Sequence, residues 1–475
     1  EFIEAARIET AVVHMSPSRP DVEGIGGSCQ MPWVKSNLGS VALVLVLHAQ
    51  TAAAQGDPLG ADEMAEAIVA MTSRVWTGPR TAPPGPVPRP PGLTRTLRSP
   101  RGLVAVHAGA SVDDATLRRA LGALELARGR LEARGWPEPI SDGELGGGSE
   151  LDVYLSTEMP PGAYADGVIP WTYLDRASAF AVVSPKLSEA SMDACLSAVY
   201  AEALLLSADP AEAKTWRRAT ATWLAWELTG RFGCQDPTPV QQAEPFRSWV
   251  AGAAARGAGG ALWLAFLSSR HSNGSAHFVR DAWSLASQRT WEGDGLRADP
   301  DLWSALDTAI RVSGDRLVDN VESLAVLRWL LGRSDPRNSA LRAIDSDARA
   351  PINRTMRRLP SRVSVSTPLQ SFGSGYVVMP SSTWGDSRQL HAWLRGEYGV
   401  RWSFVAVQLD AEHRELQRIA APHTSVTPRA YLPIELNEDA VQLLFVVTNL
   451  ADGLPDADEP EASERAFEIT VDRAD

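Results

Sequence analysis

Residues 192–206 read Met-Asp-Ala-Cys-Leu-Ser-Ala-Val-Tyr-Ala-Glu-Ala-Leu-Leu-Leu, and this stretch decides the fold of the central part of the chain. Its apolar residues recur at helical spacing and share one face: Met192, Cys195, Leu196, Val199, Ala203 and Leu206. The period predicts a helix over residues 188–207. Asp209-Pro210-Ala211-Glu212 then carries helix-start signals and Gly230 is the expected stop, so a second helix should follow the first directly.

Strands are expected before this helical pair and more helices after it. Residues 103–107, 151–155 and 179–183 have strand-like patterns, and residues 113–134 have helical spacing. Further helices are predicted over residues 243–256, 260–270, 275–289, 300–312 and 317–331. The pattern predicts an α+β domain over residues 93–345, with a small N-terminal sheet and a helical half.

The apolar period changes to two from about residue 350. Short β-rich runs are separated by Pro, Gly, Asp and Asn, and they cover residues 362–366, 376–379, 401–409, 431–436, 441–448 and 467–471. We therefore expect a C-terminal antiparallel β-sandwich over residues 346–475.

The N-terminal part has the features of an export signal. Residues 1–30 show no apolar period and are interpreted as an upstream extension rather than a domain. Residues 31–54 combine Lys35, an apolar run over 41–47 and the small residues Ala52-Ala53-Ala54, which predicts a signal peptide cut after Ala54. The run is shorter than the ~20 residues of a membrane span, and no span is expected in the mature chain. Residues 55–92 form an N-terminal segment and a Pro-rich linker, and the protein is expected to be exported to the periplasm or beyond the cell.

Composition narrows the classes of partner. The 475 residues are 44% hydrophobic and 22% charged, which excludes a disordered or fibrous protein. The balance of 45 basic and 58 acidic residues gives a net charge of -13, so a nucleic-acid partner is not expected. Removing the leader also removes Cys29, which leaves Cys195 and Cys234; in an oxidising compartment these predict a disulfide, the alternative being two buried thiols.

Strong catalytic motifs are absent from the sequence. Gly373-Ser374-Gly375 is a loop rather than a nucleophile elbow, and His271 and His277 flank a turn instead of sharing a helix face. The acidic residues near the end of the chain lack a regular calcium-loop spacing and predict a solvated loop: Asp452, Asp456, Asp458 and Glu459. The sixteen tryptophans are expected mainly in the core.

The helical pair resembles a known family. Ala198-Val199-Tyr200-Ala201-Glu202, Asp209-Pro210 and then Trp216 to Trp223 resemble exported bacterial metalloproteases of the gluzincin (zincin) type. In these proteins His-Glu-x-x-His on one helix is followed by Trp-x-Glu-Gly-x-Ala-x-Trp on the next. The resemblance extends over residues 95–475 and implies a zincin-like domain followed by the β-sandwich.

The chain departs from the family at each chemical position. The resemblance places the first zinc-binding His at Ala198, the general base at Val199, the second His at Glu202 and the third ligand at Arg218. Neither alanine nor valine can bind a metal or take up a proton, and a guanidinium repels a cation. We therefore expect no bound metal and no cofactor, although the family would bind zinc.

Glu202 and Arg218 carry opposite charges at two positions that should converge. We expect a carboxylate–guanidinium pair in the place of the zinc, joining the two helices. The alternative is that both side chains face solvent and are unrelated.

Three functions remain open. The chain is interpreted as a non-catalytic descendant of a metalloprotease that serves as a binding or structural module for an unknown protein or surface polymer. An active hydrolase with a relocated site would need His107, His271 or His277 to meet a carboxylate near a cleft. A surface-binding protein acting through its β-sandwich would show exposed aromatic residues clustered on one sheet face.

Overall fold

The computed structural model describes residues 87–168, 176–249, 259–271, 277–287, 300–331, 348–424, 427–454 and 464–474. All of them belong to one compact unit that spans Leu59–Asp475. The predicted upstream extension, the signal peptide with its cleavage site at Ala54, Cys29 and most of the Pro-rich linker lie outside the described residues. Within these ranges the protein is α+β, with one mixed sheet, a helical region and two further sheets.

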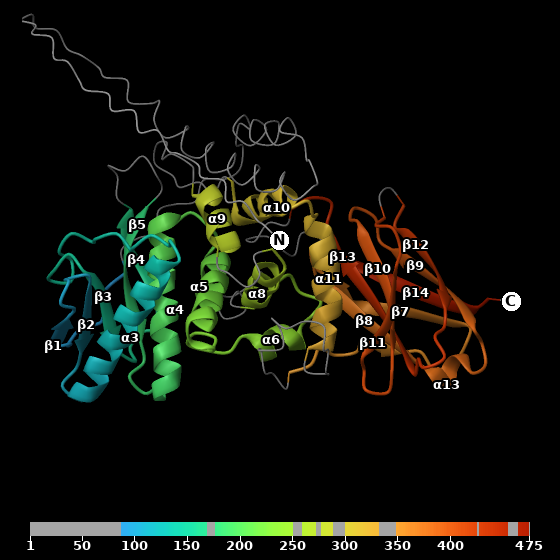
Figure 1. Ribbon diagram of the computed structural model, residues 1–475, viewed down its shortest axis with the longest axis horizontal. Helices are drawn as coiled ribbons and strands as arrows, with labels where there is room; N and C mark the ends of the chain where they lie inside the picture. Colours follow the sequence, from blue (N-terminus) through green and yellow to red (C-terminus); the bar gives the residue numbers. More distant parts are fainter. Residues whose placement is uncertain are drawn as a thin grey trace, which may run out of the picture. The chain divides into compact units, whose positions relative to one another are not determined.

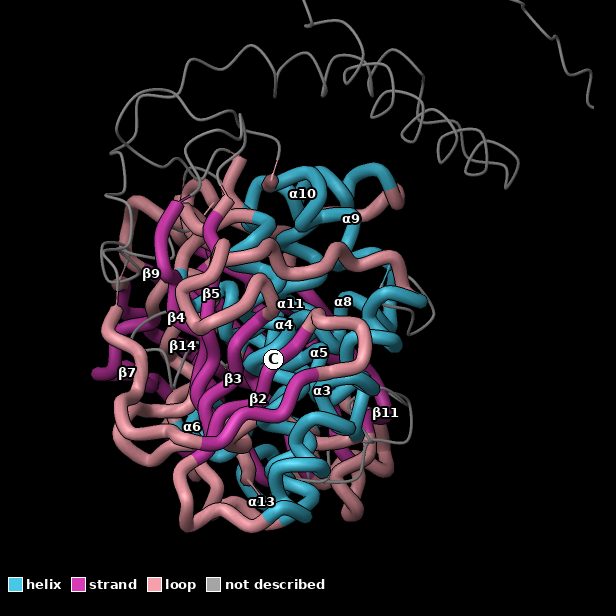
Figure 2. Tube along the Cα trace, turned by 90° about the vertical axis from the view of Figure 1, so that its left-hand side faces the viewer, coloured by secondary structure: helices cyan, strands magenta, loops and turns pink. Residues whose placement is uncertain are grey.

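The first sheet has five strands in the order β1-β2-β3-β5-β4: Arg95–Arg98, Val104–Ala108, Leu151–Leu155, Ala177–Val183 and Gly162–Val168. The three central strands are parallel, and the edge strands β1 and β4 are antiparallel to their neighbours. β2, β3 and β5 are buried throughout, as expected for strands covered on both faces. Helices α3 (Asp114–Ala133) and α4 (Glu189–Ala208) cover one face (Figure 1). Figure 2 views this sheet with the helices behind it.

Apart from a short helix in the C-terminal region, α13 (Ser381–Trp384), six further helices in the described residues follow α4: α5 (Lys214–Thr229), α6 (Thr238–Ala243), α8 (Gly260–His271), α9 (His277–Ala286), α10 (Leu302–Val312) and α11 (Leu317–Leu330). Their core is rich in tryptophan, as predicted, and the buried indoles are Trp216, Trp223, Trp249, Trp263, Trp283, Trp303 and Trp329. α4 is long and apolar enough to cross a membrane by length and composition alone, but most of it is buried inside the protein. Packing on both sides accounts for its apolar character.

Two predicted helix boundaries were wrong. α5 starts at Lys214 rather than at the Asp209-Pro210 signal, because the carboxylate of Asp209 accepts from the N–H groups of Ala211 and Glu212 in a turn of its own. The helix predicted over 243–256 does not begin at 243, because α6 ends at Ala243 and residues 244–249 are not helical; the rest of that range, 250–256, lies outside the described residues. The predicted stop at Gly230 is confirmed, with φ at 74° in the left-handed region that favours glycine.

The C-terminal region is a β-sandwich. One sheet has the order β11-β10-β13-β8-β6 and the other β12-β9-β14-β7. The strands run over Arg354–Thr355 (β6), Ser361–Leu369 (β7), Ser374–Pro380 (β8), Gln389–Gly396 (β9), Trp402–Leu409 (β10), Glu415–Ala420 (β11), Arg429–Glu435 (β12), Gln442–Asn449 (β13) and Arg465–Arg473 (β14). Apolar side chains from both sheets form the core between them. The expectation of a purely antiparallel sandwich needs one correction, since β6 pairs with β8 in parallel.

Helix α11 connects the helical region to the sandwich. Ala325, Val326 and Trp329 pack against apolar residues of β8, β10 and β13. The buried hydroxyl of Tyr376 on β8 donates to the carbonyl of Ala325, 2.7 Å away. The helical region and the sandwich therefore share an apolar interface that contains a buried hydrogen bond.

Candidate functional site

The four positions that the family resemblance singles out lie on two adjacent helices, α4 and α5. Ala198, Val199 and Glu202 are buried on α4, and Arg218 projects from α5 with its side chain 20% exposed. Ser188 is the N-cap of α4, and its hydroxyl accepts from the N–H of Ser191 in the first turn. The predicted helix over 188–207 thus fixes the register of all three positions on it.

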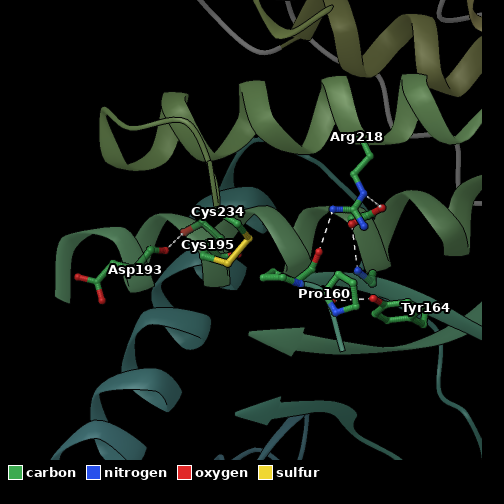
Figure 3. Close-up of a disulfide and its surroundings, with 10 residues drawn as sticks. Pro160, Tyr164, Asp193, Cys195, Arg218 and Cys234 are labelled. Carbon is green, nitrogen blue, oxygen red and sulfur yellow. Dashed lines mark hydrogen bonds and ion pairs between the residues drawn. A yellow bond between two sulfur atoms is a disulfide. The ribbon is translucent and has the colours of Figure 1, made fainter. Parts of the chain in front are cut away.

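Glu202 and Arg218 form an ion pair, with 2.6 Å between Arg218 Nε and Glu202 Oε1. The other carboxylate oxygen of Glu202 accepts from the backbone N–H of Ala163, 3.0 Å away, and Arg218 Nη1 donates to the carbonyl of Pro161 at 3.1 Å (Figure 3). The structure therefore brings the two charges together and attaches both to the start of strand β4. The alternative of two unrelated solvent-facing side chains does not hold.

Gly162 allows the Arg218 guanidinium to lie close to the backbone of β4. A Cβ on this residue would overlap the Arg218 guanidinium, so the guanidinium lies directly against the backbone of β4. Beside it, the hydroxyl of Tyr164 donates to the carbonyl of Pro160 at 2.6 Å. Burial raises the pKa of Tyr164 above its usual value, while the nearby Arg218 opposes that shift.

The disulfide between Cys195 and Cys234 is confirmed, with an S–S distance of 2.04 Å. It holds the loop after α5 against α4, next to the position assigned to the first zinc ligand (Figure 3). A Cβ on Gly233 would lie 3.0 Å from the Cβ of Ala198, so this loop occupies the space beside Ala198. A side chain larger than alanine at position 198 would have to displace the loop.

The site has neither a free base nor a set of metal ligands. The carboxylate of Glu202 is held by a guanidinium and a backbone N–H, and position 199 is a buried valine. Across the part of the chain that the structure describes, no group of three or more His, Cys, Asp or Glu side chains is arranged to hold a metal. What this arrangement can do chemically is to fasten two helices to an edge strand.

The three histidines of the hydrolase hypothesis lie in separate surroundings. His107 on β2 meets a carboxylate, 2.7 Å from Asp152 Oδ1, and its other ring nitrogen is 3.0 Å from Thr96 Oγ1. His271 ends α8 and contacts Asn320 of α11 at 3.1 Å; burial lowers its pKa. His277 is exposed at the first turn of α9. His271 also lies near a carboxylate, with 4.0 Å between its Nε2 and Asp315 Oδ2. His107 and His271 therefore each satisfy part of the requirement, and both side chains are buried, at 7% and 5% exposed.

Two features were missed by the sequence analysis. One is a buried cluster around Arg89, in the last part of the Pro-rich segment, which holds Asp142, Asp152 and Asp166. No local sequence pattern predicts this cluster, because its members come from four separate segments of the chain.

The other missed feature is an aromatic cluster on the outer face of the four-stranded sheet. Trp393 on β9 and Tyr431 on β12 are cross-strand neighbours with ring centres 5.6 Å apart, and His391 lies 5.8 and 5.5 Å from them. Trp393 is 39% exposed and Tyr431 44%. Alternation within 389–396 and 429–435 was the signal that could have found it.

Comparison with known proteins does not identify a family for this chain. No family model matches the chain, and no curated protein matches it. One solved structure with some likeness is the pre-peptidase C-terminal domain of a collagenase from Bacillus anthracis, at 9% identity and a TM-score of 0.19. The match covers 26% of this chain and 96% of that domain, and at this TM-score it says nothing about function.

Proposed function

We propose that the protein is an exported, non-catalytic binding or structural module built on a metalloprotease-like scaffold of the zincin type. One observation carries the proposal: the 2.6 Å ion pair between Arg218 and Glu202, at the two positions that the family resemblance assigns to zinc ligands. The pair links the two helices, as a bound metal would, and needs no cofactor to do so.

The residues that replace the family's zinc ligands and general base support the same proposal. Zinc hydrolysis requires an open metal position and a base beside the bound water. Here Val199 stands where the resemblance expects the base, and the loop held by the Cys195–Cys234 disulfide lies beside Ala198. The disulfide is also consistent with an oxidising or extracellular environment. We infer export to the periplasm or the medium from it together with the predicted leader.

Zinc content tests this proposal. The chain is expressed with added zinc, purified without chelator, and measured for zinc per chain alongside cleavage of a casein substrate. We expect far less than one zinc per chain and no cleavage. Near-stoichiometric zinc, or cleavage sensitive to chelators, would contradict the proposal and favour an active enzyme with a relocated site.

A second candidate function, adhesion through the β-sandwich to a surface polymer, is favoured by the aromatic cluster of His391, Trp393 and Tyr431. Exposed aromatic rings gathered on one sheet face are uncommon without a binding role, since each leaves apolar area in water. Pull-down on insoluble chitin, cellulose and peptidoglycan compares the native chain with Trp393→Ala. Tyr398→Ala is the matched control, because Tyr398 is 72% exposed and lies outside the cluster. Retention that is lost in Trp393→Ala but kept in the control would support adhesion, and no retention of the native chain would count against it.

A further inference from the structure

The outer face of the first sheet, opposite α3 and α4, is covered by residues 87–93 of the chain itself. This segment, here called the strap, reads Val-Pro-Arg-Pro-Pro-Gly-Leu. Val87 and Leu93 pack on a small apolar cluster formed by Tyr154, Phe180 and Val182 of β3 and β5. Between these two contacts the strap inserts Arg89 into the sheet surface.

Arg89 uses its whole guanidinium. Nε lies 3.3 Å from Asp166 Oδ1, and Nη2 lies 2.7 Å from Asp166 Oδ2 and also contacts Asp142. Nη1 contacts Asp152 and donates to the Tyr154 hydroxyl at 2.9 Å. Every N–H direction of the fork is therefore met by an oxygen, a geometry that a lysine ammonium cannot reproduce.

Aromatic faces complete the pocket. The guanidinium carbon lies 5.2 Å from the ring centre of Phe180 and 5.8 Å from that of Tyr154, within the range of cation–π attraction. The carboxylate of Asp152 is held by a second residue as well, because its Oδ1 lies 2.7 Å from His107 Nε2. The loop that carries Asp142 passes so close that a Cβ on Gly146 would overlap the Asp152 carboxylate.

The charges in this pocket do not balance without a cation. The side chains of Asp142, Asp152 and Asp166 are at most 5% exposed, and one guanidinium faces all three. Removing it would leave several carboxylates buried without a counter-charge, which is strongly unfavourable. The pocket therefore requires a guanidinium, whether it comes from this chain or from another one.

We propose that the outer sheet face is a binding site for arginine within an extended, proline-containing peptide, and that the chain fills this site with its own strap. The strap is then an internal ligand that a partner peptide of the same chemistry replaces. Proline-rich segments suit this use, because their extended conformation is largely formed before binding and little conformational entropy is lost. The inference does not depend on the metalloprotease-like scaffold.

Internal binding hides the site from outside ligands. A ligand tethered by a short segment has an effective concentration in the millimolar range, so a free peptide competes poorly with the intact strap. The test therefore uses full-length Arg89→Ala, which keeps the strap backbone and vacates the pocket. Arg316→Ala is the matched control, because Arg316 pairs with Asp319 on the surface rather than in a pocket.

Thermal unfolding of these variants is measured with N-ethylguanidinium or with ethylammonium at equal concentration. We expect Arg89→Ala to melt below the native chain, and N-ethylguanidinium to raise its melting temperature in a saturable manner. Ethylammonium should give no such rise, and neither compound should restore Arg316→Ala. Equal effects of the two cations, or no effect on Arg89→Ala, would overturn the proposal.

Hydrogen–deuterium exchange tests the peptide directly. A synthetic peptide of residues 87–93 is added to Arg89→Ala, with the same peptide carrying Arg89→Lys as its control. Binding in place of the strap should speed amide exchange within the strap and slow it in β3 and β4, with the lysine peptide inactive. If Arg89→Ala does not fold, Arg89→Lys replaces it in the same exchange experiment, because the lysine keeps a positive charge near the carboxylates but cannot fill the guanidinium fork. Absence of any peptide-dependent change would overturn the proposal, even if the small guanidinium binds.

Discussion

At the scale of single residues, the pairing of Arg218 with Glu202 is a buried contact whose loss should destabilise the protein. Glu202 has 4% of its side chain exposed, so it depends on its partners for the solvation it has lost. Its two contacts differ in kind, one being a guanidinium and the other a backbone N–H of β4. The charge balance of the site rests on the guanidinium.

Replacing Arg218 should therefore destabilise the protein strongly. We expect Arg218→Gln to lower the free energy of unfolding by about 3 kcal/mol, because a buried carboxylate is left without its counter-charge. The double change Glu202→Gln with Arg218→Gln should recover part of that loss. Denaturant unfolding measures both, and Arg316→Gln at the exposed Arg316–Asp319 pair should cost less than about 1 kcal/mol. Equal losses at the two pairs would contradict a buried, structural role for Arg218.

At the scale of elements, the sequence predicted the helices better than it predicted the contacts between them. The helix predicted from the apolar period of residues 192–206 is confirmed as α4, but α4 is buried all round rather than on one face. Strand β4, Gly162–Val168, was missed, since its Gly-Ala-Tyr-Ala-Asp-Gly-Val sequence has no clear apolar alternation. Its place depends instead on non-local contacts, among them the Ala163 N–H to Glu202.

Helix-start signals misled the prediction for a related reason. Glu212 was expected inside the first turn of α5, but one of its carboxylate oxygens accepts from the N–H of Leu302 at the start of α10, 2.7 Å away. The site shows the same limit. Charge at positions 202 and 218 suggested a pair, whereas the Arg89 pocket draws on β3, β4 and a Gly-rich loop that only the folded chain brings together.

The loop after α5 depends on the disulfide. Cys195→Ser with Cys234→Ser should lower the free energy of unfolding by about 3–4 kcal/mol, the range expected for a cross-link whose cysteines are 39 residues apart. Denaturant unfolding with and without reducing agent provides the measurement. The reductant should shift the midpoint of the native chain and leave that of the double variant unchanged. A native midpoint that ignores complete reduction would show that the loop is held by other contacts.

Acid should loosen the strap. Burial raises the pKa of Asp142 and Asp166, and Arg89 opposes the shift in both. While these carboxylates stay buried, loss of Arg89 raises their pKa further, so the pocket without Arg89 binds more protons and a falling pH favours release of the strap. We expect the protection of the amides in residues 87–93, taken as the intrinsic exchange rate at each pH divided by the observed rate, to fall as the pH drops from neutral toward 3.8, the ordinary aspartate pKa.

The same two raised pKa values have the opposite effect on the global stability of the protein. Groups whose folded pKa is raised stabilise the folded state fully at low pH, and this stabilisation is lost as the pH rises through the folded pKa. Asp142 and Asp166 therefore do not drive acid unfolding. Exchange at β3, corrected for the intrinsic pH dependence of amide exchange, serves as the internal control. Parallel acceleration of β3 and the strap would contradict selective release.

At the scale of the whole molecule, the interface of α11 with β8, β10 and β13 should make the helical region and the sandwich unfold together. Its apolar side chains are buried in one continuous cluster, and the Tyr376 hydroxyl is bonded across it. A mutation in the sandwich should therefore also lower the stability of the helical region, and the reverse should hold.

Tyr376→Phe tests this coupling. We expect a loss of about 1 kcal/mol, because the buried hydrogen bond to Ala325 disappears while the ring keeps its packing. Hydrogen exchange of α5 reports on the helical region and hydrogen exchange of β10 on the sandwich, and both should shift by the same amount. Tyr398→Phe, at an exposed position, should change neither. Separate transitions for the two probes would show that the regions unfold independently.

The position of the strap also has a mechanical meaning. Arg89 is anchored to β3 and β4, and it stands at the N-terminal border of the folded sheet. Tension applied to the chain from the N-terminal side of the strap would reach this guanidinium before it reaches any strand of the described residues. The ionic contacts of Arg89 with Asp142, Asp152 and Asp166 would bear this force and break before the strands separate, so the strap would protect the sheet from mechanical unfolding.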